Sequence, residues 1–247
     1  MDWWEAAVFL ACAFVAEVIG TMAGFGAATV LTPIAALFFD MKTAIAIVAC
    51  FHFFGNASRL VFFGRHVSWI HWAQFGLVGV AGSLAGASLT TALSAALLKL
   101  LFGAFLLGYV ALEATAADRV RLPTRRSTLV GGGAVSGFIA GLLGTGGAVR
   151  SVCLLAFGLA KEVYIGTSAA IALVVDATRL PIYLAGHLIP PSIAPLVVGL
   201  IGAAFAGAWL GQRLIHRVSA VGFRRFVLAT LALMGLKFFL EGWHGVA

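Results

Sequence analysis

Apolar runs of 17 or more residues recur along almost the whole of this 247-residue chain. Hydrophobic residues make up 62% of it and charged residues only 10%, whereas about a quarter of the residues in an ordinary soluble domain are charged. A helix needs roughly 20 mainly apolar residues to cross the hydrocarbon core of a bilayer. The sequence therefore predicts an all-α polytopic membrane protein, with the lipid bilayer as its surroundings.

The formal net charge of +7 does not indicate nucleic-acid binding. Membrane proteins collect Lys and Arg in their cytoplasmic loops, which accounts for such an excess without a nucleic-acid partner. The first residues, MDWWEAAVFL, are acidic and lack the basic start and small-residue cleavage site of a signal peptide. We expect them to begin the first membrane segment.

The chain matches itself when it is shifted by 120 positions, so that residues 24–60 fall on 144–180. Nine of these 37 positions are identical, whereas chance in a chain so rich in Ala, Leu and Gly would give roughly three or four. This indicates a duplication, with a first transmembrane repeat at 1–116, a basic linker at 117–127 and a second repeat at 128–247.

Each repeat contains a short apolar run that directly follows a glycine-rich break. The breaks are GFGAA and GTGGA, and the short runs are 27–39 and 147–160. Both runs are too short to cross a membrane alone, and the glycines before them can interrupt a helix. The longer runs are expected at about 5–21, 42–63, 70–93, 98–115, 128–143, 162–185, 192–212 and 220–240.

The distribution of Lys and Arg decides how these broken segments are arranged. If each broken pair returns to its own side as a hairpin, and three full crossings follow, ten basic residues share one side and three the other. If each pair crosses once, the split is five against seven, with Lys237 left out because it lies at a helix end. The positive-inside rule therefore favours the hairpins. Three crossings per repeat invert the second repeat, an arrangement typical of secondary transporters. The loops expected in the cytoplasm are 64–66, 117–126, 161–162 and 213–225.

The starts of the two short helices, near Ala27 and Gly147, are predicted to bind an anion. Broken helices of inverted-repeat transporters place such ends near the bilayer midplane, where unpaired backbone N–H groups and the helix dipole attract negative charge. An alternative is that the glycines only allow tight helix packing. The glycines that would let a ligand approach the backbone are Gly24, Gly26, Gly144, Gly146 and Gly147.

The same motif frames an arginine in both repeats: NASRL at 56–60 and DATRL at 176–180. An Arg at the centre of a membrane span costs on the order of 2.5–3.5 kcal/mol and usually faces a partner or a water-filled cavity. Asp176 and Arg179 are three residues apart on one helix face and can neutralise each other. Asn56 stands where the second motif has its aspartate, so Arg59 lacks a local counter-charge.

Three roles for Arg59 follow from this. It can pair across the protein with Asp176 or Glu17, it can offer its guanidinium to an anionic substrate, or it can extend to the membrane surface, only six residues before Arg65. Surface extension explains either arginine alone, but not the shared motif. We therefore take Asn56, Arg59, Asp176 and Arg179 as candidate substrate-binding residues.

Five further polar residues lie in apolar segments. Glu17 and His52 are candidates for proton coupling, because a buried carboxylate or imidazole can carry a proton; the alternative for both is a structural ion pair or hydrogen bond. Arg150, in the first turn of the second short helix, can add positive charge to the anion site or bond a neighbouring carbonyl. Thr167 and Ser168 are expected to offer hydroxyls to an oxyanion, or to bond their own backbone.

The two matched segments also carry a family resemblance. Residues 22–69, with GFGAA and NASRL, and residues 140–188, with GTGGA and DATRL, resemble the two signatures of the sulfite exporter TauE/SafE family. The resemblance covers nearly the whole chain and implies a bacterial membrane permease linked to export of sulfite or organosulfonates. Neither break has the commoner G-x-G-G-G pattern of the family.

Together these features predict a secondary transporter, an exporter of small anions such as sulfite or an organosulfonate, that works by alternating access in the bacterial inner membrane. An anion channel, or a cation or metal permease using Glu17 and Asp176, stays open as an alternative, as does assembly into a homo-oligomer. We find no nucleophile motif, no HExxH and no nucleotide-binding motif. The chain is therefore expected to be no enzyme and to need no cofactor or metal.

Overall fold

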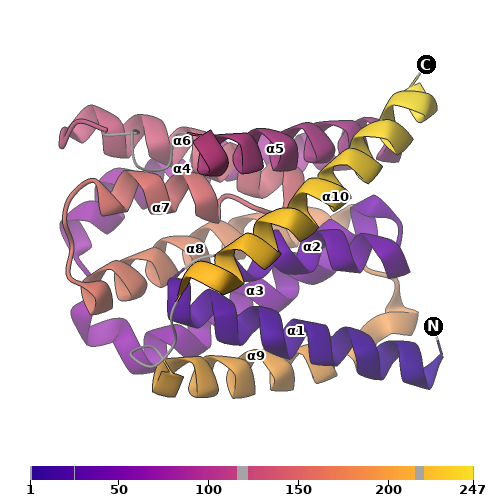
Figure 1. The fold of residues 1–247 in the computed structure, drawn as a ribbon, viewed down its shortest axis with the longest axis horizontal. Helices are drawn as coiled ribbons and strands as arrows, with labels where there is room; N and C mark the ends of the chain where they lie inside the picture. Colours follow the sequence, from indigo (N-terminus) through magenta and orange to yellow (C-terminus); the bar gives the residue numbers. More distant parts are fainter. Residues whose placement is uncertain (1, 25, 116–121, 215–219, 247) are drawn as a thin grey trace.

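The computed structural model of the chain describes residues 2–24, 26–115, 122–214 and 220–246, with side chains for all of these except 220–227 (Figure 1). The described part is helical throughout and contains no strand. Its α-helices are α1 (Trp3–Ala23), α2 (Ala27–Phe38), α3 (Met41–Phe63), α4 (Trp69–Ala92), α5 (Ala95–Thr115), α6 (Arg126–Leu143), α7 (Gly147–Leu155), α8 (Lys161–Ala185), α9 (Ala194–Leu214) and α10 (Ala220–Val246). Two 3₁₀ turns, Gly64–His66 and Pro191–Ile193, precede α4 and α9.

The glycine breaks end one helix and begin the next, as the sequence predicts. Gly24 and Gly144 stop α1 and α6 with left-handed backbone, at φ angles of 76° and 79°. Gly26 precedes α2 with a φ of 100°. These angles are open to glycine and disfavoured for side chains with a Cβ, so the glycines themselves make the turns possible.

Seven of the helical segments in the described part are long and apolar enough to cross a membrane, and they include α1 and α6. The helices after the breaks are much shorter. At 1.5 Å per residue, the 12 residues of α2 extend about 18 Å and the nine residues of α7 about 14 Å, against a hydrocarbon core of about 30 Å. Neither can cross alone.

The second short apolar run, 147–160, extends past the helix that it contains. Helix α7 ends at Leu155, and a turn follows that contains Gly158 with a φ of 62°. The hydroxyl of Thr124, on the segment before α6, donates to the carbonyl of Ala156 at 3.2 Å. The apolar composition extends past the helix because this turn packs against the preceding segment.

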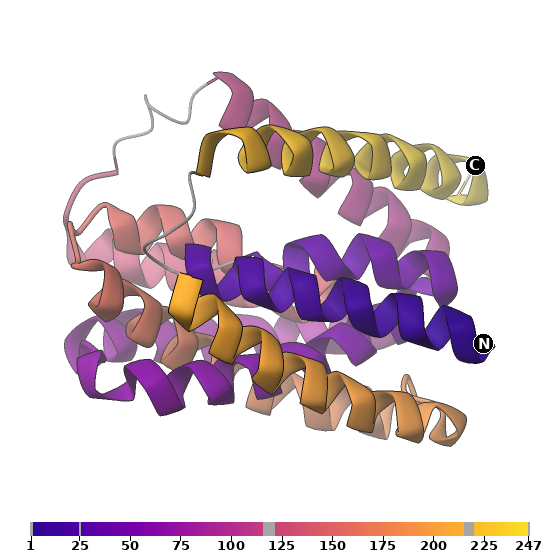
Figure 2. The ribbon, with the colours of Figure 1, turned by 60° about the horizontal axis from the view of Figure 1, so that its bottom comes forward.

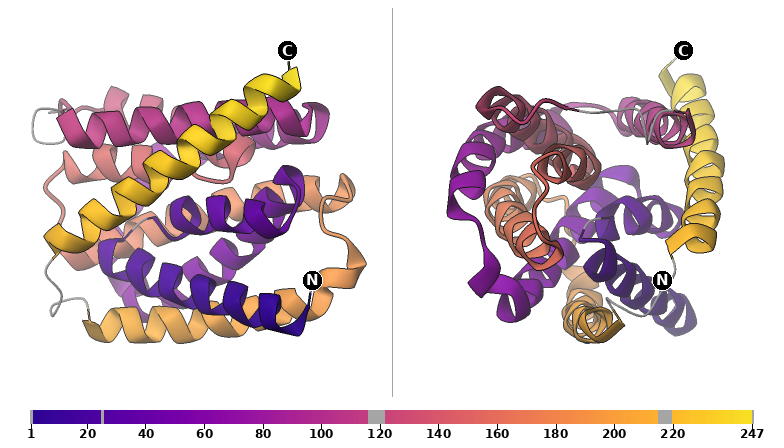
Figure 3. Two further views of the ribbon diagram at one scale, coloured as in Figure 1. Left: turned by 45° about the vertical axis from the view of Figure 1, so that its right-hand side comes forward. Right: turned by 60° about the vertical axis from the view of Figure 1, so that its left-hand side comes forward.

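The helices pair across the two halves of the sequence. Helices α3 and α8 contact each other and have the most buried spans of the bundle. Around them α4 packs along α6, α1 along α9, and α5 along α10. Figure 3 shows this arrangement from two sides. In Figure 2, α5 and α10 form one flank of the bundle. If each helix is exchanged for its counterpart in the other half, the α4–α6 contact becomes the α9–α1 contact, and the α3–α8 and α5–α10 contacts become themselves.

Small residues set how closely these pairs approach. A Cβ added at Gly137 of α6 would collide with the backbone of Gly79 in α4. The α1–α9 contact is also close, because a Cβ on Gly207 would lie 2.7 Å from the Cβ of Glu17. Such small-residue contacts are common between membrane helices, where dispersion and short backbone approaches drive packing.

Both described ends of the chain lie at the same end of the bundle. The start of α1 and the end of α10 are at the right in Figure 3, left panel, whereas α5 ends and α10 begins at the left. The short helices begin inside the protein, since Ala27, Ala28 and Ala148 are at most 5% exposed. Two helix starts therefore lie within the bundle instead of at its ends.

Candidate functional site

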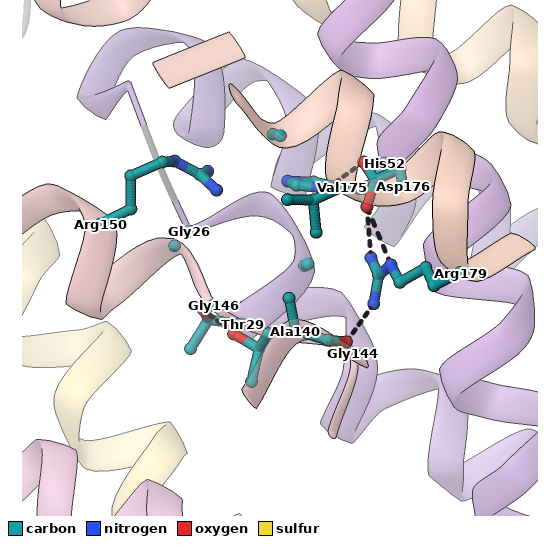
Figure 4. A pocket seen from close by; sticks show the side chains of 14 residues that line it. Gly26, Thr29, His52, Ala140, Gly144, Gly146, Arg150, Val175, Asp176 and Arg179 are labelled. Carbon is teal, nitrogen blue, oxygen red and sulfur yellow. Dashed lines mark hydrogen bonds and ion pairs between the residues drawn. The ribbon is translucent and has the colours of Figure 1, made fainter. Parts of the chain in front are cut away.

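A small cavity lies where the two glycine breaks meet α3 and α8 (Figure 4). The breaks and the starts of α2 and α7 form its backbone wall, and polar side chains of α3, α7 and α8 form the rest. Its lining residues are Gly26, Ala28, Thr29, His52, Ala140, Gly144, Thr145, Gly146, Gly147, Arg150, Ala172, Val175, Asp176 and Arg179.

The backbone wall presents two helix starts to one space. Gly26 and Gly146 precede the first helical residues of α2 and α7, and both line the cavity. The first N–H groups of an α-helix have no partner within the helix. Gly26 has no heavy atom within 4 Å of where a Cβ would be, so its backbone is open to the cavity. Ser136 of α6 holds the other break by donating to the carbonyl of Gly146 at 2.8 Å.

A hydroxyl contact joins the two breaks. The Oγ1 atoms of Thr29, in the first turn of α2, and Thr145, between α6 and α7, lie 2.5 Å apart and share a hydrogen bond. Both residues are buried, at 4% and 1% exposure. The bond joins the two helix starts at the cavity wall.

Asp176 connects the polar groups on the α3–α8 side. Its Oδ2 lies 2.9 Å from Nδ1 of His52 on α3 and accepts a hydrogen bond from Asn56 at 3.3 Å. Its Oδ1 accepts from Nε of Arg179 at 2.9 Å, and Nη2 of the same guanidinium is 2.7 Å away. Arg179 also donates through Nη1 to the carbonyl of Ala140. Figure 4 shows the contacts among His52, Asp176, Arg179 and Ala140 along one side of the cavity.

Arg59 forms a separate buried pair that does not line the cavity. Its Nη2 is 2.6 Å from Oε1 of Glu17, an ion pair by distance although not an aligned hydrogen bond. Its Nε donates to Thr21 at 3.0 Å, and its Nη1 to Asn56 at 3.2 Å. Glycine makes room for the pair, since a Cβ on Gly55 would lie 2.5 Å from Oε2 of Glu17.

Arg150 reaches the cavity from α7. Its Nε donates to the hydroxyl of Ser168 at 2.9 Å, and that hydroxyl donates to the carbonyl of Gly24 at 3.0 Å. The side chain is 2% exposed, and its Nη2 is buried without a hydrogen-bond partner.

The structure separates the residues that the sequence proposed for the site. Seven of them line the cavity: Gly26, His52, Gly144, Gly146, Gly147, Asp176 and Arg179. Seven others do not: Glu17, Gly24, Ala27, Asn56, Arg59, Thr167 and Ser168. Asn56, Ser168 and Gly24 contact lining residues or their partners, as described above. Thr167 lies elsewhere, where its hydroxyl accepts from the backbone N–H of Ser68 before α4 at 2.9 Å.

The structure decides between the roles that the sequence left open for Arg59 and Arg179. Of the partners open to Arg59, the structure gives Glu17. Neither Arg59 nor Arg179 extends to the surface, because each is 1% exposed.

Sequence reasoning missed Thr29 and Thr145. Each is polar in only one half: position 29 matches Val149 and position 145 matches Phe25. The duplication that highlighted the arginines therefore carried no signal for them. Ala28, Ala140, Ala172 and Val175 were also missed, because small apolar residues that line a cavity look like ordinary packing residues.

No group of three or more His, Cys, Asp or Glu side chains that could hold a metal ion occurs within the described ranges. None of the curated proteins and none of the solved structures matches the chain. A family model described as sulfite exporter TauE/SafE matches residues 9–238. The match covers nearly the whole chain, including both glycine breaks and the residues that line the cavity between them. The chain therefore belongs to the sulfite exporter TauE/SafE family.

Proposed function

We propose that this membrane protein is a secondary transporter that exports a small anion, sulfite or an organosulfonate, through the cavity between the two glycine breaks. The observation that carries the proposal is that two helix starts and two arginines, Arg150 and Arg179, surround one cavity in a chain of an exporter family. Helix N-termini and guanidinium groups both favour oxyanions.

The pairing of the helices supports alternating access. The main helix–helix contacts of the bundle persist when each helix is exchanged for its counterpart, as expected of a protein whose halves are related by a pseudo-twofold axis. In inverted-repeat transporters the substrate site lies at the interface of the repeats, and one repeat or bundle rocks against the other. Here the cavity is lined by both halves, so relative motion would expose it to one side at a time.

Charge supports an orientation in the membrane. Basic residues of the described part, Arg65, Arg125, Arg126, Lys161 and Arg213, lie at or beside helix termini on the side where α5 ends and α6 begins (Figures 1 and 2). Lys42 and Lys99 lie at helix starts on the opposite side. By the positive-inside rule the first side faces the cytoplasm, in the inner membrane of a bacterium. Part of the expected basic loops, 117–121 and 215–219, lies outside the described residues.

His52 is the stronger of the two candidates for proton coupling. It lines the cavity, whereas Glu17 lies outside the lining with Arg59 beside it. The charged or polar groups that act on the imidazole are Asn56 and Arg59 on its own helix and Asp176 and Arg179 on α8. Protonation of His52 would thus add a positive charge directly at the proposed anion site.

The rival functions are separable. A cation or metal permease would need free carboxylates, but Glu17 and Asp176 each have an arginine nitrogen within 2.7 Å. An anion channel could use the same residues, and it would conduct without saturation and without acceleration by substrate on the opposite side.

The test is to reconstitute the purified protein in liposomes on a solid-supported membrane and to record transient currents after rapid addition of sulfite, methanesulfonate, sulfate, chloride or magnesium. We expect a saturating response to a sulfur oxyanion and faster flux with the same anion on both sides. Gly26→Ala should weaken the response, because it places a methyl group at a positive φ beside the cavity. The control is Gly108→Ala in α5, where the added Cβ meets nothing within 4 Å. A response to magnesium alone would overturn the proposal.

A further inference from the structure

The buried arginines near the cavity differ in what balances their charge. Arg59 has Glu17, and Arg179 has Asp176. Arg150 has no carboxylate within ion-pair distance among the described residues; its guanidinium donates instead to the neutral hydroxyl of Ser168. A charge buried in a protein is costly unless it is paired, so the unpaired state of Arg150 calls for an explanation.

The position of Arg150 favours a ligand as the missing partner. Its Nε is fixed by Ser168, which is held in turn by the carbonyl of Gly24. This leaves Nη2 as a buried donor with no acceptor. Figure 4 shows the guanidinium pointing from α7 into the cavity, toward the side where His52 and Asp176 lie.

The charges around the cavity can be summed. Its ionisable lining residues are His52, Arg150, Asp176 and Arg179. The Asp176–Arg179 pair is neutral as a unit, and Arg150 adds one positive charge. With His52 neutral, the wall therefore carries a single net positive charge, and one singly charged anion balances it.

We propose that Arg150 is the residue that binds the substrate's charge, and that the site prefers a singly charged oxyanion, a sulfonate or hydrogensulfite, over a dianion such as sulfate. This rests on the proposed function, because it concerns the same cavity. The anion would lie against Nη2 of Arg150 and the N–H groups that begin α7 at Gly147. Arg179 is committed to Asp176 and to the carbonyl of Ala140, and it serves to hold that carboxylate in place.

The test combines thermal unfolding and currents for the full-length protein, with methanesulfonate as the monoanion and sulfate as the dianion, at about pH 8, where an unperturbed histidine is neutral. The variants are Arg150→Gln, which removes the charge, and Arg150→Lys, which keeps it. The matched control is Arg65→Gln, which removes an exposed arginine from the turn before α4.

For the wild type we expect methanesulfonate to raise the unfolding temperature and to bind more tightly than sulfate. Arg150→Gln should weaken methanesulfonate binding about 10- to 100-fold, the range of one charged hydrogen bond. It should also unfold at the wild-type temperature or above when no anion is present, because a buried unpaired charge is gone. Arg150→Lys should keep part of the affinity, and Arg65→Gln all of it.

Each contrary result has a distinct meaning. A wild type that responds to no sulfur oxyanion would reject the proposed function itself. A responding wild type with unchanged affinity in Arg150→Gln would reject the role of Arg150 alone. Loss of folding in Arg150→Gln without anion would make the arginine structural and also reject it. Equal affinities for sulfate and methanesulfonate at this pH would reject the preference for single charge.

Discussion

Arg59 and Arg179 occupy matching positions in the two halves but have different partners. The partner of Arg179 is Asp176, which lies three residues earlier on the same helix and lines the cavity. The partner of Arg59 is Glu17 on α1, and this pair lies outside the cavity lining. Both halves thus have the arginine at the same position of the motif, but the carboxylate that pairs with it is in the motif in one half and on another helix in the other half.

Helix packing explains why this exchange occurs in one half only. The residue that matches Glu17 is Gly137 on α6, and a Cβ there would collide with the backbone of Gly79. A glutamate cannot fit at that position. On the opposite side of the bundle, Gly207 of α9 leaves space for the side chain of Glu17. The first pair is therefore suited to hold α1 and α3 together, and the second to shape the site.

The largest effect that we expect on stability comes from breaking the first pair. Arg59→Gln leaves Glu17 charged and fully buried without a cation, which should cost about 3–5 kcal/mol of unfolding free energy. The measurement is chemical or thermal unfolding in detergent. The double variant Glu17→Gln/Arg59→Gln should recover part of the loss, since no charge is left unpaired. If the double variant is as unstable as the sum of the singles, the ion pair is not the cause.

A second comparison uses the glycines that end α1 and α6. Their φ angles are 76° and 79°, so alanine is strained at either by about 1–2 kcal/mol. At Gly24 the new Cβ would also collide with the ring of Tyr164, whereas at Gly144 its nearest contact is at 3.5 Å. Adding an overpacking cost, we expect about 2–4 kcal/mol for Gly24→Ala, and only the strain for Gly144→Ala. Equal losses in unfolding experiments would show that the collision is relieved at no cost.

Breaking the Asp176–Arg179 pair should reduce the free energy of unfolding less than breaking the Glu17–Arg59 pair does, but it should reduce anion transport more. In Arg179→Gln, Asp176 keeps His52 and Asn56 as partners and borders the cavity, so we expect a loss of about 1–3 kcal/mol. Anion-dependent current should fall further than in Arg59→Gln when the two are compared at equal folded fraction. The opposite order would mean that the Arg59 pair contributes more to transport than the Arg179 pair does.

How much of this was predictable depends on how local each signal is. Helix ends at Gly24 and Gly144 follow from run length and glycine, which act within a few residues. Pairing of Asp176 with Arg179 follows from their spacing on one helix. The choice of Glu17 over Asp176 as the partner of Arg59 does not, because it depends on how α1, α3 and α8 are rotated against one another.

The cavity wall shows the same limit. The repeated glycines were predicted as part of a site, and Gly26, Gly144, Gly146 and Gly147 do line one cavity. Two roles stayed open for Arg150 in the sequence, since nothing near it there shows whether a carboxylate will pack beside it. Thr29 and Thr145 are 116 positions apart and have no polar counterparts, so only the folded arrangement brings them together.

The smallest effect that we expect comes from that threonine contact. Thr29→Val or Thr145→Val removes one hydroxyl and leaves the other buried without its partner, at a cost of about 1 kcal/mol. Because both single variants lose the same bond, the double variant should be no less stable than either single one, whereas independent sites would add. Thr115→Val, which alters an exposed threonine at the end of α5, is the control. Additive losses would mean that the two hydroxyls act separately. Coupled losses, accompanied by weaker methanesulfonate binding, would mean that the bond between the two halves holds both helix starts in position for the anion.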